Sequence, residues 1–182
     1  MKVIGINGSP KKEGNTAFAL NLVGDQLKDN GIDFEILEIG SQVIRGCTSC
    51  YACANNQNEK CAIDDVVNEA IQKIKVADGL VLGTPVYYAS VNGTVKSFLD
   101  RLFFVAGTNG GLFRHKVGAS VVAVRRSGGL PAFHDLNNYL MFSEMIIPAS
   151  NYWNVIHGAV PGEAVKDLEG VQIMEVLGKN MA

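Results

Sequence analysis

The sequence predicts an α/β domain in which five parallel strands form a sheet with helices on both faces, a three-layer sandwich. Short apolar runs alternate with amphipathic segments from one end of the chain to the other, as in a parallel sheet built from right-handed crossovers. The 182 residues are enough for one such domain, and there is no repeat or linker. We expect a single domain over residues 1–182 with strand order 2-1-3-4-5.

The first half of the chain supplies three of the strands. Lys2–Asn7 is a short apolar run before a glycine turn, which is typical of a buried first strand. Gly31 ends the first helix, and Pro85 ends the third strand. The elements expected here are strands at Lys2–Asn7, Asp33–Ile39 and Asp78–Thr84, and helices at Thr16–Asn30 and from Ile63 to about Val76.

The second half continues the alternation. The run after Lys116 is very apolar, as expected of a central strand, and Asp167 and Glu169 lie near the start of the last helix. The elements expected here are helices at Gly93–Phe104, Leu130–Glu144 and Glu163–Lys179, and strands at Lys116–Arg125 and Ile146–Trp153.

Composition and charge exclude several classes of protein. Apolar residues make up 47% and charged residues 19%, which is typical of a globular protein. The formal net charge of −2 gives no indication of a nucleic acid or an anionic membrane as partner. No apolar run reaches the roughly eighteen residues of a transmembrane helix. The N-terminal apolar run is too short for a signal peptide, so we expect a cytoplasmic protein.

The loop after the first strand, Gly8–Thr16, has the composition of an anion site, and we call it the phosphate loop. Its glycines allow backbone N–H groups to turn toward a phosphate, and a helix N-terminus follows. It fits neither the P-loop spacing nor the dinucleotide fingerprint, which favours a mononucleotide. The expected phosphate ligands are Ser9, Lys11, Asn15 and Thr16. The alternative is a mobile turn in which Asn15 or Thr16 simply caps the helix.

The loops after the third and fourth strands should meet the phosphate loop at the same edge of the sheet. They offer aromatic and small side chains, free backbone amides and an arginine, which suit a flavin ring. The residues expected to contact the ring are Pro85, Val86, Tyr87, Tyr88, Ser90, Arg125, Gly128 and Gly129. A rigid surface turn and a solvated arginine pair are the alternative interpretations.

All four cysteines lie in Cys47–Cys61, which we call the cysteine segment. Cys47, Cys50, Cys53 and Cys61 have the spacing C-x₂-C-x₂-C-x₇-C, and its first part resembles ferredoxin spacing. They are therefore candidate ligands of a 4Fe–4S cluster. Zinc binding, redox-sensing thiols and a buried structural role for Cys61 remain alternatives.

Several segments together resemble the NAD(P)H-dependent FMN reductase and iron–sulfur flavoprotein family, across essentially the whole chain. They are Gly8–Thr16, Gly83–Arg101, Arg125–Gly129, Tyr152–Gly158, Pro161–Gly162 and Asp167–Gly170. Lys11 stands where this family usually has arginine. The resemblance implies a flavodoxin-like fold, bound FMN, reduction by NADH or NADPH, and a homodimer or homotetramer with the flavin near a subunit interface. Iron–sulfur flavoproteins of the family carry a compact cysteine motif in the same loop.

The loops and the resemblance together predict an FMN-dependent oxidoreductase that passes electrons to a quinone, a flavin or an iron–sulfur protein, and the resemblance implies NAD(P)H as the electron donor. The chemistry resides in flavin N5, so no catalytic side chain is expected. The histidines His115, His134 and His157 are scattered along the sequence, and Trp153 is expected in the core or an interface. One alternative is a flavodoxin-like or iron–sulfur flavoprotein electron carrier, although −2 is a weak charge for protein docking. Another is a regulatory protein that merely uses this fold.

Overall fold

The computed structural model describes residues 1–182 and contains one central parallel sheet. The order is β2-β1-β3-β5-β6, which confirms the predicted order of the five parallel strands. A short sixth strand, β4 (Ser90–Val91), pairs antiparallel with the end of β3. The parallel strands are β1 (Lys2–Asn7), β2 (Asp33–Glu38), β3 (Gly79–Tyr87), β5 (Val117–Val124) and β6 (Val155–His157).

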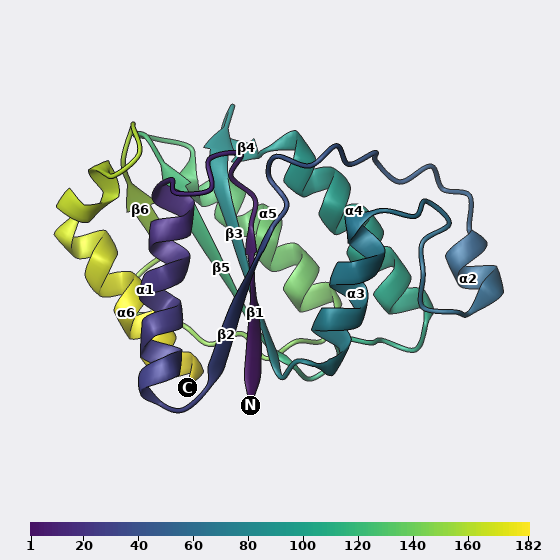
Figure 1. Ribbon diagram of the computed structural model, residues 1–182. Coiled ribbons are helices and arrows are strands. Elements are labelled where there is room, and N and C mark those ends of the chain that lie inside the picture. Colours follow the sequence, from purple (N-terminus) through teal and green to yellow (C-terminus); the bar gives the residue numbers. More distant parts are fainter.

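Helices cover both faces of the sheet (Figure 1). The core is divided accordingly: one apolar cluster lies beneath α1 and α6, and a larger one lies beneath α3, α4 and α5. None of the helices combines the length and apolar character that crossing a membrane requires. The main helices are α1 (Asn15–Asp29), α3 (Val66–Val76), α4 (Gly93–Thr108), α5 (Gly129–Phe142) and α6 (Leu168–Met181).

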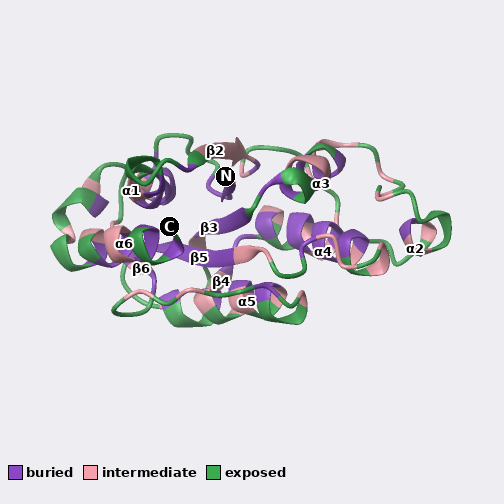
Figure 2. Cartoon of the chain, turned by 90° about the horizontal axis from the view of Figure 1, so that it is seen from below, coloured by how far each residue is buried: buried purple, intermediate pink, exposed green.

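The cysteine segment lies outside this three-layer core. It contains one short helix that the sequence did not predict, α2 (Ala52–Asn56), at the end of the molecule beyond α4 (Figure 1). Figure 2 shows β3 and β5 as buried, whereas α2 and the chain on either side of it are largely exposed or intermediate. The segment therefore has no strand or long helix to fix its path.

The predicted fifth strand, Ile146–Trp153, is wrong. Ile146 makes only an isolated bridge with Val117, and Pro148 soon interrupts the run because it has no N–H for a sheet ladder. Ile146 is also 59% exposed, so its apolar side chain does not mark a core strand. The edge strand is β6, in which Ile156 is fully buried.

The predicted end of the third strand at Pro85 is also wrong, because β3 continues to Tyr87. Pairing of β3 with β1 ends at Gly83, whereas pairing with β5 continues to Pro85, so this part of β3 is an edge where proline is tolerated. The turn after Tyr87 then leads into β4.

Several helix boundaries differ from the predicted ones, and two of the differences coincide with side-chain caps. Asp65 caps α3 by accepting a hydrogen bond from the N–H of Val67, so the helix begins after the predicted start. Asp167 caps α6, and the predicted first turn of that helix is a separate 3₁₀ helix, η1 (Glu163–Lys166). Helix α4 runs beyond Phe104 to Thr108.

Candidate functional site

A pocket of about 150 Å³ lies at the carboxyl ends of the parallel strands. The end of β3 and the loops that follow β1, β5 and β6 all contribute to it, as expected where the strand order reverses. The structure brings together many of the residues predicted from the sequence, and the lining includes Ser9, Lys11, Asn15, Thr16, Pro85, Val86, Tyr87 and Arg125.

The N-terminus of α1 opens into this pocket without a side-chain cap. Its N-cap residue is Gly14, and no acidic residue lies in the first turn. The alternative in which Asn15 or Thr16 caps this helix is therefore wrong. By contrast, Asp65, Asn92 and Asp167 cap α3, α4 and α6, whereas α5, which begins after Gly128, has no side-chain cap either. The first N–H groups of α1 thus have no side-chain acceptor, which is the arrangement that binds anions.

A backbone hydrogen bond and a side-chain hydrogen bond fix the base of the phosphate loop. The N–H of Gly8 donates to the carbonyl of Gly83 at 2.9 Å, and the side-chain Nδ2 of Asn92 donates to the carbonyl of Gly8. A Cβ at Gly8 would lie 2.1 Å from Cγ2 of Val95 and 2.8 Å from the Gly83 oxygen. Only glycine lets the phosphate loop approach β3 and α4 this closely.

Side chains within the phosphate loop also bind the protein itself. Ser9 is buried, and its Oγ accepts a hydrogen bond from the N–H of Lys11 at 3.1 Å. Asn15 Nδ2 donates to the Val160 carbonyl at 3.0 Å, and its Oδ1 accepts from the N–H of Ala164 at 3.3 Å. Asn15 therefore joins the phosphate loop to the chain after β6, and one hydrogen on its amide remains for a ligand.

The chain after β6 closes one side of the pocket, and sequence reasoning missed it. Gly158, Ala159 and Pro161 contribute to the lining. The glycine and proline were visible, but the fifth strand was placed too early, so its following loop was not recognised as part of the strand-end cluster.

Tyr88 and Ser90 do not line this pocket. Tyr88 is fully exposed in the turn between β3 and β4, with a φ of 49°. The Ser90 hydroxyl donates to the Asp135 carboxylate at 2.6 Å. Gly128 has a φ of 87°, and a Cβ there would lie 2.8 Å from the Ala89 Cα, so this glycine permits the two loops to touch.

A larger pocket of about 480 Å³ lies beside the first, on the other side of the loop after β5. Gly128 and Gly129 line this second pocket. So do the aromatic pair Tyr152 and Trp153, whose ring centroids are 4.6 Å apart. The sequence did not predict this pocket.

A histidine–carboxylate pair lies in the lining of the larger pocket. His157 Nδ1 is 3.1 Å from Asp167 Oδ2, which also accepts the backbone N–H of His157 at 2.7 Å. Burial favours a higher pKa for Asp167, but the N–H groups of Gly170 and His157 and the His157 ring outweigh it, so the pKa is lowered. No local sequence signal linked these two residues.

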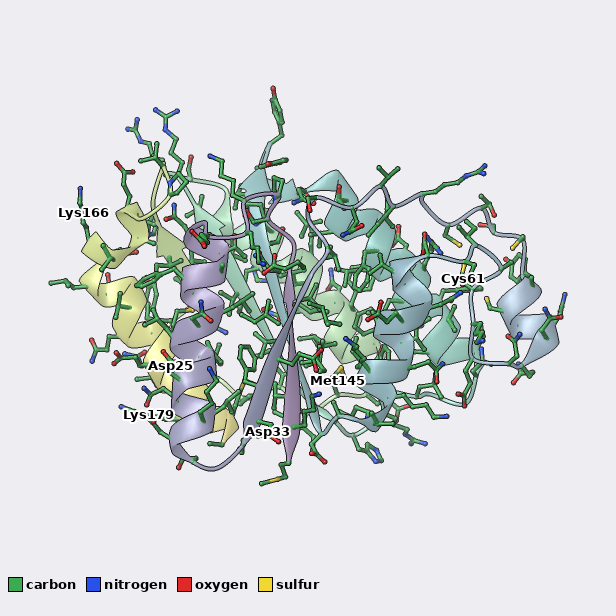
Figure 3. The ribbon with its side chains drawn as sticks, in the orientation of Figure 1. Asp25, Asp33, Cys61, Met145, Lys166 and Lys179 are labelled. Carbon is green, nitrogen blue, oxygen red and sulfur yellow. The ribbon has the colours of Figure 1, made fainter.

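The four cysteines line one small, mostly apolar pocket against α4. Figure 3 shows Cys61 with other sulfur atoms around it, at the opposite end of the molecule from Lys166 of η1. All four thiols are free: Cys53 is buried, Cys61 is partly buried, and Cys47 and Cys50 are exposed. No three side chains of the metal-binding types are close enough to hold a metal ion in the present arrangement.

The environment of Cys50 favours its thiolate. The backbone N–H of Ala52 and then the Thr48 hydroxyl lower the pKa of Cys50. Because thiolates are both the metal-binding and the reactive form of cysteine, this exposed side chain is the most reactive thiol expected in the segment.

Comparison with known proteins supplies a family. The family model described as NADPH-dependent FMN reductase matches residues 1–159. An iron–sulfur flavoprotein of Methanocaldococcus jannaschii is 33% identical over an alignment that covers all of this chain and 96% of the relative.

Two solved structures share the fold. RosB, determined with bound 8-demethyl-8-formylriboflavin-5′-phosphate, superposes with a TM-score of 0.80 at 16% identity, covering all of this chain and 77% of RosB. The NAD(P)H:quinone oxidoreductase from Methanothermobacter marburgensis superposes with a TM-score of 0.70 at 13% identity, covering all of this chain and 99% of that protein. These likenesses establish a flavodoxin-like α/β fold.

Proposed function

The chain belongs to the NADPH-dependent FMN reductase family, and on this premise we propose that it is an oxidoreductase that passes electrons from NAD(P)H through bound FMN to an acceptor. The observation that carries the proposal is the uncapped N-terminus of α1, which opens into the pocket where the loops after β1 and β5 meet the end of β3. A helix end left without a side-chain cap inside a pocket fits the phosphate of a mononucleotide.

The residues of the pocket fit FMN. Ser9, Lys11, Thr16 and the remaining amide hydrogen of Asn15, which all line the pocket, would hold the phosphate together with the α1 amides. The Pro85–Tyr87 strand end would lie against the ring, and the Arg125 guanidinium would favour negative charge on it. The chemistry that FMN supplies when bound is the acceptance of a hydride at N5 and the transfer of its electrons to the acceptor.

The acceptor we propose is a quinone, a free flavin or an iron–sulfur protein. An electron carrier without a small-molecule substrate is the second candidate, because the fold serves both purposes. Catalytic turnover separates them: a reductase oxidises NADH or NADPH continuously when a quinone or free flavin is supplied. A carrier exchanges electrons only with a protein partner and shows no such turnover.

The experiment is a visible absorption spectrum of protein purified without oxygen, recorded before and after addition of NADH or NADPH. We expect flavin bands that either nicotinamide bleaches. Protein that is colourless and takes up no added FMN would contradict the proposal and favour a regulatory protein with this fold.

The cysteine segment carries the donor atoms for a second redox centre, which is part of our proposal. Four thiols around one pocket are the donor set of a 4Fe–4S cluster, and the Methanocaldococcus relative is an iron–sulfur flavoprotein by name. We propose that the segment gathers Cys47, Cys50, Cys53 and Cys61 around such a cluster, which would exchange single electrons with FMN. Iron and sulfide analysis tests this, together with a broad absorption shoulder near roughly 400 nm that Cys→Ser replacement removes. Flavin bands alone would leave zinc, sensing or structural roles for the thiols.

We also propose a homodimer or homotetramer. Apolar side chains remain exposed around the larger pocket and at the end of α5, among them Tyr152, Trp153 and Phe142. Light scattering on a sizing column measures the assembly, and a monomer at micromolar concentration would contradict it.

A further inference from the structure

Arg101 of α4 is the most unusual buried side chain in the molecule. It is 1% exposed and heads the set of large, fully buried side chains. A buried guanidinium is costly unless every donor has a partner, so its contacts show what it is there to hold.

Every hydrogen bond that Arg101 donates goes to the cysteine segment or to the residues immediately before and after it. One terminal nitrogen donates to the Arg45 carbonyl at 3.2 Å and to Asp65 Oδ2 at 2.6 Å. The other donates to the Ile63 carbonyl at 2.8 Å and to Asp65 Oδ1 at 2.9 Å. Nε donates to Cys61 Sγ at 3.3 Å. One guanidinium thus holds the two ends of the cysteine segment together on α4.

The four cysteines differ as a result. Arg101 contacts the sulfur of Cys61 alone, and no other side chain of α4 donates to a cysteine sulfur. Cys53 is buried on α2, where its carbonyl accepts a hydrogen bond from Asn109 Nδ2 at 3.2 Å. Cys47 and Cys50 are exposed. The pocket therefore has a fixed side, formed by Cys53 and Cys61, and an exposed side.

We propose that Arg101 is the positioning residue of the cysteine segment: it fixes both ends of the segment and directs Cys61 Sγ into the pocket that the four cysteines share. This part of the proposal rests on the iron–sulfur centre proposed above. Cys61 is then the preformed ligand, and the Nε–H of Arg101 donates a hydrogen bond to a ligand sulfur. Hydrogen bonds to cluster sulfurs raise the reduction potential, so Arg101 sets that potential as well.

The first test measures the alkylation rate of each cysteine by iodoacetamide in metal-free protein, using mass spectrometry of peptides. Arg101→Lys keeps the charge but loses the planar fork, so we expect Cys61 to react at least roughly tenfold faster. Cys53 is the internal control, because general loosening of the protein would accelerate it too. Arg114→Lys is the matched control, since Arg114 is an exposed arginine that pairs with Glu144 and lies outside this pocket. An unchanged Cys61 rate, or equal acceleration of Cys53, overturns the proposal.

The second test uses protein reconstituted with ferrous iron and sulfide under anaerobic conditions. We expect the midpoint potential of the iron–sulfur centre to become more negative in Arg101→Lys and to remain unchanged in Arg114→Lys. Equal potentials in Arg101→Lys and the unsubstituted protein overturn the hydrogen-bonding role. If the unsubstituted protein takes up no iron, the iron–sulfur function fails, and the alkylation rates still decide whether Arg101 positions Cys61.

If Arg101→Lys does not fold, the unsubstituted protein gives the answer in low concentrations of urea. Cys61 then becomes reactive only when the contacts of Arg101 open, so its alkylation rate should rise with urea while the rates of Cys47 and Cys50 remain flat. A Cys61 rate that does not depend on urea overturns the proposal.

Discussion

The phosphate loop and the cysteine segment are both irregular, yet the protein holds them by different means. The phosphate loop follows β1 directly, and its position depends on backbone contacts such as the one between Gly8 and Gly83. The cysteine segment leaves the sheet altogether, and side chains of α4, above all Arg101, attach it. A loop that follows a strand is thus placed mainly through the backbone, to which side chains such as Asn92 add, whereas a segment outside the sheet depends on individual side chains.

The same helix serves both regions. The N-cap residue of α4, Asn92, donates to the carbonyl of Gly8, and the C-cap residue, Asn109, donates to the carbonyl of Cys53. Substitutions along α4 should therefore separate flavin binding from the conformation of the cysteine segment.

Among these substitutions, Gly8→Ala should disrupt the phosphate loop most strongly. The added Cβ would meet Val95 and the Gly83 oxygen, so we expect a loss of about 1–3 kcal/mol in the free energy of unfolding and at least roughly a hundredfold weaker FMN binding. Chemical denaturation and flavin fluorescence titration measure both. Gly107→Ala is the control, because nothing lies within 4 Å of that Cβ and the helix interior favours alanine. Unaltered FMN binding in Gly8→Ala would show that the close approach is unimportant.

Replacing Asn92 by alanine should affect the start of α4 and the phosphate loop together. The change removes the N-cap of the helix and the hydrogen bond to the Gly8 carbonyl, so we expect a loss of about 1–2 kcal/mol in stability. FMN affinity should fall as well, while alkylation of Cys61 stays at its normal rate. Faster Cys61 alkylation would mean that the two regions are coupled through α4.

Asn109→Ala, at the other end of α4, should affect the cysteine segment and leave the phosphate loop unchanged. It removes the donor to the Cys53 carbonyl and the acceptor of the Glu59 N–H, so we expect about 1 kcal/mol of destabilisation. Proteolysis should occur sooner within the cysteine segment, and FMN affinity should remain within roughly twofold of its normal value. Weakened FMN binding would contradict independent attachment of the two regions.

The smallest effect concerns Asp167, beside the larger pocket. Its folded-state pKa lies below the ordinary value, so the stability it contributes is present above that ordinary value and is lost as pH falls through the folded pKa. We expect Asp167→Asn to lower stability by at most about 1 kcal/mol at pH 7, with the difference from the unsubstituted protein shrinking below about pH 4. Asparagine keeps an oxygen for only one of the two backbone N–H groups that the carboxylate accepts, those of Gly170 and His157, so a loss that does not depend on pH accompanies the loss of the charge. Denaturation curves at pH 7 and pH 3 that differ by the same amount would contradict this assignment.

Sequence reasoning succeeded where a pattern is local and failed where packing intervened. The apolar run at Lys2–Asn7 and the helical spacing after Asn15 predicted β1 and α1 nearly to the residue. The fifth strand was predicted too early at Ile146, because the sequence alone does not distinguish an exposed apolar side chain from a buried one. In the site, the loops after β1 and β3 were recognised, whereas the loop after β6 was missed with its strand.

The alternation of strands and helices and the chemical character of the loops could be predicted from the sequence, because periodicity and turn residues act over a few neighbours, and the sheet order followed from the known rule for such alternation. Only the tertiary structure decided that Gly14 leaves α1 uncapped, that Asn15 joins Ala164, and that Arg101 meets Cys61. Residues 40 or 149 positions apart come together through the crossovers of the sheet. Their pairing depends on which side chains the packed core leaves facing each other, and no local pattern records that.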